Sequence, residues 1–327
     1  MTQHDALLAA VCAAPDDDLP RLVFADWCDE NGQPDRAEFI RTQIAIANGA
    51  KRNVLEQLRK RETELLAEHQ AKWTEHLQTF TDDFREDPIR FRRGFVEAIS
   101  INDELLAEHG DELFRLAPIR TLRMCDQDIE SLHKCEHLLR VTTLELTGCA
   151  LDEEYRDTAK FFRSRVLANL TTLVAQGFDD NGHLDAGALR AIVESNFLTK
   201  LRRLDIGGNW LFNIPTSEHD EITRLLMAVG NLPALTELSL DRVGVFSAVI
   251  RELAAQTWMA RIKRLDLYYN QAGDDGGRAL AESPHLDNIE HLDLRDNDGF
   301  DPETGRSPMS DAVKRLLKRR FGKRVLV

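Results

Sequence analysis

The stretch LRRLDIGGN at residues 201–209 recurs as IKRLDLYYN at 262–270 and as IEHLDLRDN at 289–297. Each copy has apolar residues at its first, fourth and sixth positions and an asparagine at its ninth. Alternate apolar residues are typical of a short strand with one buried face. The asparagine can turn inward where the strand ends and satisfy backbone groups there. A unit this short cannot bury its apolar face alone, so the pattern predicts units that stack.

A leucine occupies the fourth position of this pattern along most of the chain. It recurs at Leu122, Leu144, Leu173, Leu204, Leu238, Leu265 and Leu292. The last two gaps match the roughly 20–29 residues of a leucine-rich repeat, in which a strand is followed by a helix. The longer gaps indicate insertions, and Val243 departs from the pattern at an asparagine position. We predict an α/β leucine-rich repeat solenoid over residues 94–327, a short horseshoe with parallel strands on its concave face and helices outside.

Residues 1–93 contain no repeat and are rich in helix-forming residues. We predict a small all-helical domain, with helices over about 5–13, from near 18 toward 31–32, after a cap at Asp35, and from 51 to 69 or beyond. At the other end, a cap from about residue 308 should close the repeats. It is expected to contain a helix that begins after Ser310 and stops at Gly322, and then a strand at 325–327.

Two parts of the chain resemble known families. Residues 94–327 resemble ribonuclease-inhibitor-like leucine-rich repeat proteins, and NQAGDDGGRAL at 270–280 is similar to their strand-to-helix turn. The stretch DDDLPRLVFADW at 16–27, with RAEFIR at 36–41, resembles the bacterial repeat-companion domain that precedes such repeats. RRGFVE at 92–97 is similar to the junction between the two. The resemblance implies a bacterial protein of this architecture, but the companion domain brings no established activity with it.

Composition narrows the class of protein. The net charge of −14, from 56 acidic and 42 basic side chains, argues against general nucleic-acid binding. Five cysteines without a C-x-x-C motif fit a reducing compartment. The small apolar stretch at 6–14 lacks the preceding basic residues of a signal peptide, and no apolar run approaches the roughly 20 residues that span a bilayer. We expect a cytoplasmic protein, monomeric and without a membrane partner.

No catalytic signature was found. The sequence has no G-x-S-x-G, P-loop, H-E-x-x-H or dinucleotide-binding glycine motif. The stretch HKCEH at 133–137, with Cys125 and Cys149, lacks the usual zinc-ligand spacing, and DDNG at 179–182 lacks the ligand order of a calcium loop. We therefore expect no enzymatic activity, no cofactor and no metal.

Strand positions that alternate with the buried leucines should face outward on the concave side of the repeats. In the C-terminal half they combine acidic residues with arginine and tyrosine, which protein interfaces favour. We expect a partner protein, whose identity the sequence does not give, to bind there. The candidate contact residues are Arg203, Asp205, Glu237, Ser239, Asp241, Arg264, Asp266, Tyr268, His291, Asp293 and Arg295.

Other roles stay open. The protein can instead be a regulator of an enzyme, of the GTPase-activator or enzyme-inhibitor type, or it can bind a ligand or act as an enzyme through its N-terminal helices. Arg21 and Asp26–Trp27 are candidates for such a ligand site, although an Arg and an Asp about one turn apart more often pair on a helix. The basic residues between 314 and 324 can bind an acidic partner, or they favour the helix dipole and the solubility of the cap.

Overall fold

The structure is a computed structural model that describes residues 2–81, 88–125, 129–149, 151, 158–177, 184–209, 211–212, 219–297 and 309–327. It is a mixed α/β protein whose strands are mostly parallel. The chain forms two compact units, Met1–Arg123 and Met124–Val327, each described here by itself. The boundary expected between residues 93 and 94 marks a change in sequence pattern. The two compact units are defined by packing, so they do not test that boundary, and it stays a prediction.

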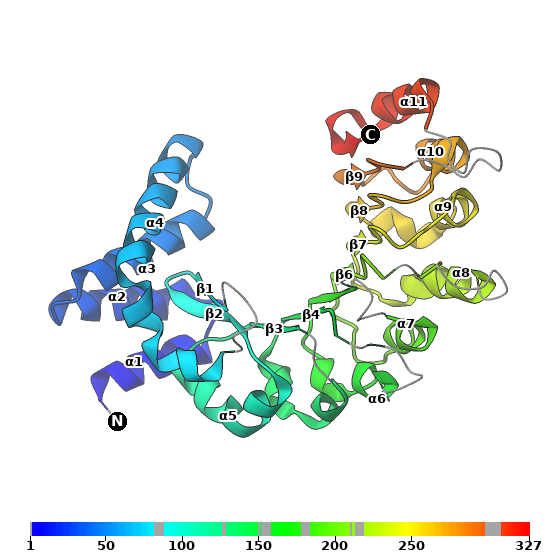
Figure 1. Cartoon of the computed structure of the whole chain (residues 1–327). Coiled ribbons are helices and arrows are strands. Elements are labelled where there is room, and N and C mark those ends of the chain that lie inside the picture. The colour runs from blue at the N-terminus through cyan, green and yellow to red at the C-terminus, as the bar shows by residue number, and fades with distance from the viewer. Residues whose placement is uncertain are drawn as a thin grey trace. The chain divides into compact units, whose positions relative to one another are not determined.

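The first unit combines helices with a small sheet (Figure 1). Its elements are α1 (Gln3–Ala13), α2 (Asp18–Glu30), α3 (Pro34–Ala47), α4 (Arg52–Thr74), η1 (Glu75–Phe80), β1 (Ile89–Arg92), β2 (Phe95–Ser100), α5 (Asp103–Leu116) and β3 (Thr121–Cys125), whose last two residues belong to the second unit. β1 pairs antiparallel with β2, which pairs parallel with β3. The four helices expected before residue 80 are present, but β1 contradicts the expectation that residues 1–93 are all helical. The expected cap at Asp35 is also wrong, because α3 begins with Pro34 and its N-cap Gln33 makes no side-chain hydrogen bond.

The core of the first unit joins its helices to the sheet. Phe24 of α2, Ile40 of α3 and Phe95 of β2 are buried together, and the Phe24 and Phe95 rings meet edge to face at 5.1 Å. The turn between β1 and β2 uses Arg93 and Gly94, both at positive φ (49° and 84°), as a tight two-residue hairpin requires. A Cβ at Gly94 would lie 2.6 Å from Ile40 Cα, so only glycine lets the turn approach α3 this closely.

The second unit repeats a strand followed by a helical segment. Its strands are β4 (Thr143–Thr147), β5 (Thr172–Gln176), β6 (Arg203–Asp205), β7 (Glu237–Ser239), β8 (Arg264–Asp266), β9 (His291–Asp293) and β10 (Val325–Leu326), and its α-helices are α6 (Thr158–Phe162), α7 (Ala186–Val193), α8 (His219–Ala228), α9 (Ser247–Ala254), α10 (Gly273–Glu282) and α11 (Asp311–Phe321). Short 3-10 helices follow or replace some of them: η2 (Glu130–Lys134), η3 (Glu136–Arg140), η4 (Arg165–Leu167), η6 (Val229–Asn231), η7 (Thr257–Arg261) and η8 (Gly322–Arg324). Each of β4 to β9 pairs parallel with the next strand of this unit.

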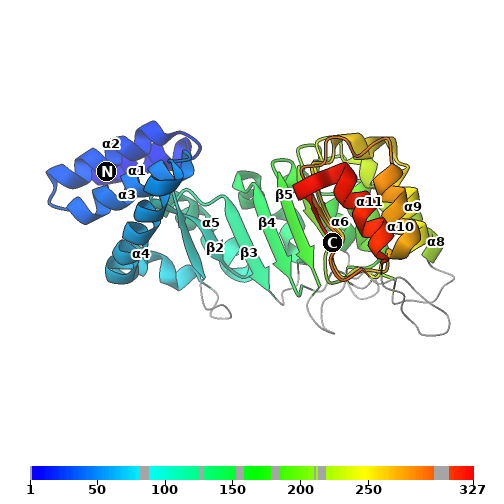
Figure 2. The ribbon, with the colours of Figure 1, turned by 90° about the horizontal axis from the view of Figure 1, so that it is seen from above.

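The predicted leucines set the register of these strands. Leu144, Leu173, Leu204, Leu238, Leu265 and Leu292 are direct partners across neighbouring strands, and each is at most 2 % exposed. Helices α8 to α11 stack in chain order along one side of the strands (Figures 1 and 2). The leucine side chains therefore form the layer between strands and helices, while the alternate strand positions point away from it.

The inward asparagines act as the sequence predicts. Asn209 donates from Nδ2 to the carbonyls of Ala175 and Ile206, at 2.8 and 2.9 Å, and accepts from the Leu184 amide at 2.8 Å. Asn270 and Asn297 make equivalent bonds two and three repeats later. Each of these asparagines is at most 5 % exposed, so one side chain joins the backbones of two consecutive repeats.

The C-terminal elements also match their prediction. Ser310 Oγ accepts from the Val313 amide at the start of α11, and α11 ends at Gly322, where φ is +60°. β10 then pairs parallel with β9. Among the helices of the described residues, none combines the length and the apolar character that a membrane crossing requires.

Candidate binding surface

The outward positions of the C-terminal strands line a hollow of about 350 Å³ in the second unit. Every residue that the sequence nominates for the concave face lies on its wall, joined by Gln176 and Leu238. The structure thus brings the candidate residues together, and their role in binding stays a prediction. Three rows of side chains, defined by strand register, make up the surface.

The first row places an acid between two arginines and ends in a histidine. Arg203, Glu237, Arg264 and His291 are direct partners on strands β6 to β9. Arg264 Nε lies 4.0 Å from the Glu237 carboxylate, at the limit of an ion pair. Because these side chains are about half exposed, their mutual attraction is weak. They remain available to charges on another molecule.

The second row is acidic. Asp205, Ser239, Asp266 and Asp293 face one another across β6 to β9, where neighbouring strands lie about 4.8 Å apart. Asp205 accepts from Arg203 at 3.1 Å and from Gln176 at 3.2 Å. At the other end of the row, both carboxylate oxygens of Asp293 accept hydrogen bonds from the Arg295 guanidinium, at 2.5–3.1 Å. The outer acids of the row therefore have cationic partners.

Asp266, in the middle of this row, has no such partner. Its carboxylate accepts from the Tyr268 amide at 2.9 Å, and among the described residues no Lys or Arg lies within ion-pair distance of it. Burial raises its pKa, and the nearby charges of Asp293, Asp241 and Asp205 raise it further. In Asp293, burial also raises the pKa, but the hydrogen bonds from Arg295 outweigh it and the net shift is downward. The centre of the hollow is thus a site of uncompensated negative charge.

The third row carries Gly207, Asp241, Tyr268 and Arg295. Asp241 lies against Gly207, where any Cβ would collide with its carboxylate, and it accepts from Ser239 Oγ at 3.0 Å. The Arg295 guanidinium lies over the Tyr268 ring, 5.6 Å from its centre. A hydrogen bond to Asp296 raises the pKa of the Tyr268 hydroxyl. This row adds an aromatic face and a further acid, Asp241, to the wall.

Sequence reasoning did not single out two residues beside the hollow, Arg242 and Asp296. Arg242 pairs with Asp241 at 3.0 Å, and Asp296 bonds to Tyr268. Both, like Tyr269, have positive φ, between 52° and 56°. The sequence could have indicated them only by their position, because each directly precedes the inward residue of its repeat.

Two stretches contain residue types that can bind a metal, HKCEH at 133–137 and DDNG at 179–182, and neither was expected to do so. In the described residues, no group of three or more His, Cys, Asp or Glu side chains is arranged to hold a metal ion. Of the HKCEH stretch, Cys135 is half-buried, and burial raises the pKa of its thiol. The DDNG stretch at 179–182 lies outside the described residues.

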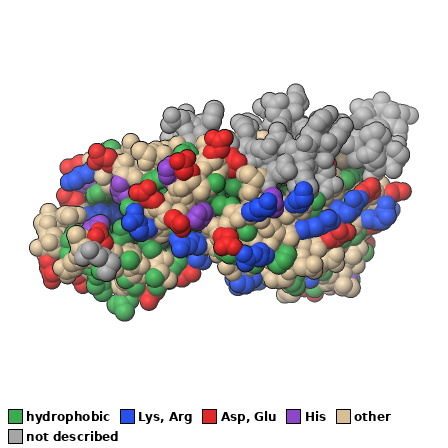
Figure 3. All heavy atoms as spheres, turned by 90° about the horizontal axis from the view of Figure 1, so that it is seen from below, with side chains coloured by type: hydrophobic (Ala, Val, Ile, Leu, Met, Phe, Trp, Pro, Cys, Tyr) green, Lys and Arg blue, Asp and Glu red, His purple; other side chains and the backbone are tan. Residues whose placement is uncertain are grey.

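The basic residues of the C-terminal cap divide into two groups. Arg320 donates to the Ala281 carbonyl and pairs with Asp287 at 3.0 Å, and Arg324 donates to the Ile289 carbonyl at 2.8 Å. These two hold α11 and β10 against the preceding repeat. Lys314 is half-buried, and the remaining four expose their charge on α11 or after it: Arg315, Lys318, Arg319 and Lys323. On another face of the second unit, Lys and Arg side chains also gather, but with Asp and Glu beside them (Figure 3).

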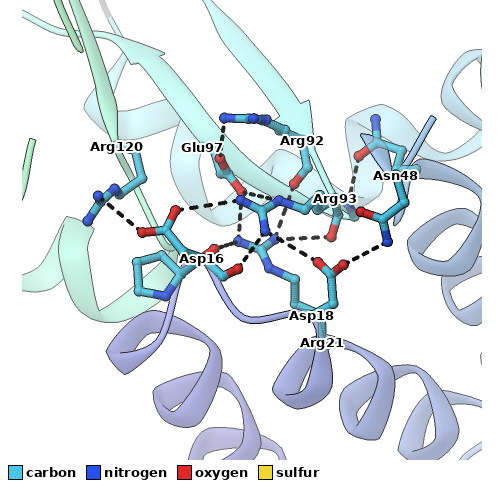
Figure 4. Close-up of polar contacts among 11 residues, drawn as sticks. Asp16, Asp18, Arg21, Asn48, Arg92, Arg93, Glu97 and Arg120 are labelled. Atoms are coloured by element: carbon cyan, nitrogen blue, oxygen red, sulfur yellow. Dashed lines mark hydrogen bonds and ion pairs between the residues drawn. The ribbon is translucent and has the colours of Figure 1, made fainter. Parts of the chain in front are cut away.

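In the first unit, Arg21 belongs to a buried network at the β1–β2 turn (Figure 4). Its guanidinium donates to Glu97 at 2.6 Å and to the carbonyls of Pro15 and Arg93 at 2.7 and 3.0 Å. Asp26 instead pairs with Arg41 of α3 at 2.6 Å, so the expected helix pair between Arg21 and Asp26 is wrong. Burial lowers the pKa of Arg21 and raises that of Glu97. Both terminal nitrogens of Arg21 are therefore used inside the fold, while its buried Nε has no hydrogen-bond partner in the described residues.

Comparison with known proteins adds one partial likeness. No protein-family model matches the chain, and no curated protein matches it. A crystal structure of an internalin, InlF, from Listeria monocytogenes is similar over 64 % of the chain, with 15 % sequence identity and a TM-score of 0.34. The chain spans 57 % of the length of that internalin. The basis for a function therefore lies in the chemistry of the chain itself.

Proposed function

We propose that the chain is a leucine-rich repeat protein with a companion-like N-terminal domain, and that it binds a partner protein through the hollow of its second unit. The observation that carries the proposal is the acidic row, whose central carboxylate at Asp266 has no ion-pair partner in the described residues, although the Arg295 charge acts on it from farther away. A partner that presents a Lys or Arg side chain would supply the missing charge.

The rest of the wall fits the same kind of partner. The acids Asp205, Glu237, Asp241, Asp266 and Asp293 outnumber the cations Arg203, Arg264 and Arg295 along it. Tyr268 and Arg295 are of the residue types that contribute most at protein interfaces. Strands supply the row positions, so the charged groups lie on a rigid surface and lose little conformational freedom on binding.

We also propose that the protein acts by binding, not catalysis, inside a reducing compartment such as the bacterial cytoplasm. The five cysteines include no C-x-x-C motif, which supports a reducing environment. On the wall of the hollow, Ser239 Oγ donates to Asp241, whose carboxylate is already paired with Arg242, so we propose no nucleophilic role for this serine. The outer acids of the wall are held by guanidinium groups or backbone amides.

The test is a charge reversal at the centre of the hollow, Asp266→Lys, with the full chain immobilised. Proteins retained from source-cell lysate are quantified by mass spectrometry for wild type, for Asp266→Lys and for a matched control, Asp275→Lys. Asp275 is an exposed acid on α10 with the same charge. We expect a basic partner that wild type and the control retain equally and that Asp266→Lys loses.

Salt dependence provides the second readout. Binding of the retained protein should weaken as ionic strength rises, because solvated charges across the interface are screened. Equal retention by Asp266→Lys and wild type would refute the proposal, and so would the absence of any protein that depends on the hollow. Circular dichroism of all three proteins excludes unfolding as the cause of a loss.

A further inference from the structure

A second cavity, of about 300 Å³, lies within the first unit and plays no part in the proposed function. α1, α2, α3, α4, η1, the end of α5 and strands β1 and β2 all contribute to its wall. Much of the wall is apolar or aromatic, with Phe24, Trp73, Phe91 and Phe95 among its residues. Its size is at the lower end of cavities that enclose small molecules.

One guanidinium group dominates the polar part of this wall. The guanidinium Cζ atom of Arg36, on α3, lies 4.9 Å from the centre of the Trp73 ring. It is 5.2 Å from the centre of the Phe95 ring and 5.7 Å from that of the Phe91 ring. Its Nη1 is buried and has no hydrogen-bond partner in the described part of the chain. Burial lowers the pKa of Arg36 to about 10, which leaves the group charged at neutral pH.

Arg21, in the same unit, is a buried arginine whose charge is held within the fold, although its Nε has no hydrogen-bond partner in the described residues. Its Nη1 and Nη2 atoms donate to three backbone carbonyls and to Glu97. Arg36 has no acid in that position, and the group that faces it electrostatically is the Cys28 thiol. Burial raises the pKa of that thiol to about 11, so the thiol is neutral. Arg36 is half-buried, and its Nη1 is a buried donor without a partner in the described residues. Such a donor is costly to the fold, and a bound anion would remove this cost.

The other titratable groups of the wall keep the cavity positive. Lys72 adds a cation, while the one wall carboxylate, Asp35, lies 3.5 Å from His69. Burial lowers the pKa of His76, and the Arg36 charge lowers it further, so this ring is neutral at pH 7. His4 lies 3.5 Å from Asp5. Because Asp35 offsets the charge of Lys72, the net positive charge of the wall is about that of Arg36 alone. A ligand with one negative charge therefore matches the cavity better than a ligand with two.

We propose that this cavity binds a small organic monocarboxylate with an aromatic or apolar body. The fork of Arg36 matches the geometry of a carboxylate, to which guanidinium groups donate two parallel hydrogen bonds. Trp73, Phe91 and Phe95 pack against the body of the ligand. This inference is independent of the partner site, because each of its residues lies in the first unit.

The first experiment measures affinity for the full-length wild type by isothermal titration calorimetry. Benzoate and phenylacetate are the carboxylate probes, and benzyl alcohol, benzylamine and phenyl phosphate are the comparisons. We expect both carboxylates to bind, and the alcohol and the amine to bind roughly 10- to 100-fold more weakly, because they lose a charge-assisted hydrogen bond. Absence of carboxylate binding at millimolar concentration, or tighter binding of phenyl phosphate, would overturn the proposal.

The second experiment tests Arg36 with three variants. Arg36→Met should abolish benzoate binding, and Arg36→Lys, which keeps the charge but loses the fork, should weaken it at least about tenfold. The control is Arg41→Met. Arg41 lies on the same helix, and its substitution removes a surface guanidinium that pairs with Asp26 and Asp29. It should bind benzoate like wild type.

Thermal unfolding separates a ligand site from a structural role. Because Nη1 makes no hydrogen bond, Arg36→Met without ligand should unfold at the wild-type temperature or above it. Benzoate should raise the unfolding temperature of wild type and of Arg41→Met but leave that of Arg36→Met unchanged. An Arg36→Met variant that unfolds, together with an Arg36→Lys variant that binds benzoate like wild type, would make Arg36 a structural residue and refute the proposal.

Discussion

Replacing Asn270 with alanine tests whether the inward asparagines hold consecutive repeats together. Its Nδ2 donates to the carbonyls of Leu240 and Leu267 at 2.8 and 3.0 Å, and its Oδ1 accepts from the Val245 amide at 2.9 Å. The side chain is 5 % exposed, so water cannot replace these bonds. At about 1 kcal/mol for each lost hydrogen bond, Asn270→Ala should lower the free energy of unfolding by roughly 3 kcal/mol.

The assay is urea unfolding of the full chain followed by circular dichroism, with Asn231→Ala as the control. Asn231 ends the short helix η6 and is exposed, so its loss should change the free energy of unfolding by less than about 0.5 kcal/mol. Hydrogen exchange adds a local readout, since the Val245 amide loses its acceptor only in Asn270→Ala and should exchange faster there. If the two variants differ by less than about 1 kcal/mol, the asparagine bonds do not hold the repeats together.

Two further predictions concern buried charge. Asp266→Asn should raise the free energy of unfolding at pH 7 by on the order of 0.5–1 kcal/mol, because burial and neighbouring acids raise the pKa of this carboxyl. A raised pKa in the folded state makes the carboxylate destabilising as pH rises through that pKa. The gain in the free energy of unfolding, measured with urea, should therefore vanish at pH values well below the ordinary pKa of 3.8. An equal gain at pH 3 and pH 7 would contradict this cause. Glu97→Gln should cost about 3–5 kcal/mol by leaving the Arg21 charge buried without its partner, whereas Arg21→Met with Glu97→Leu should recover most of that loss in thermal unfolding. Strictly additive losses would show that the two side chains do not act as a pair.

The architecture of the second unit was largely predictable because its determinants are local and periodic. A leucine such as Leu265 and an asparagine such as Asn270 are five residues apart in one phrase, and their burial follows from strand geometry alone. The outward residues of the same phrases line one hollow for the same reason, since parallel strands in register place equivalent positions side by side. The cap at Ser310 could likewise be found from a serine just before an apolar helix pattern.

The first unit was less predictable because its key contacts join distant residues. Arg21 and Glu97 are 76 residues apart, and no spacing rule links an arginine on α2 to a glutamate on β2. β1 is four residues long, too short to give an alternating pattern of its own. Arg36 meets Trp73 and Phe91 only after α3, α4 and β1 have packed. Tertiary packing therefore decides both the network and the cavity.

Backbone conformation points to the same end of the second unit as its charges do. Glycine precedes the inward residue at Gly148 and Gly208, where φ is 69° and 74°. In the last three repeats that position holds Arg242, Tyr269 and Asp296, also at positive φ. Such a conformation costs a non-glycine residue roughly 1–2 kcal/mol, so glycine would stabilise the chain at each of these positions. In place of glycine, these side chains provide polar contacts to residues of the hollow: Arg242 pairs with Asp241, and Asp296 bonds to Tyr268. Strain of this kind concentrates at functional sites, and here it lies beside the hollow in which the Asp266 carboxylate has no ion-pair partner among the described residues.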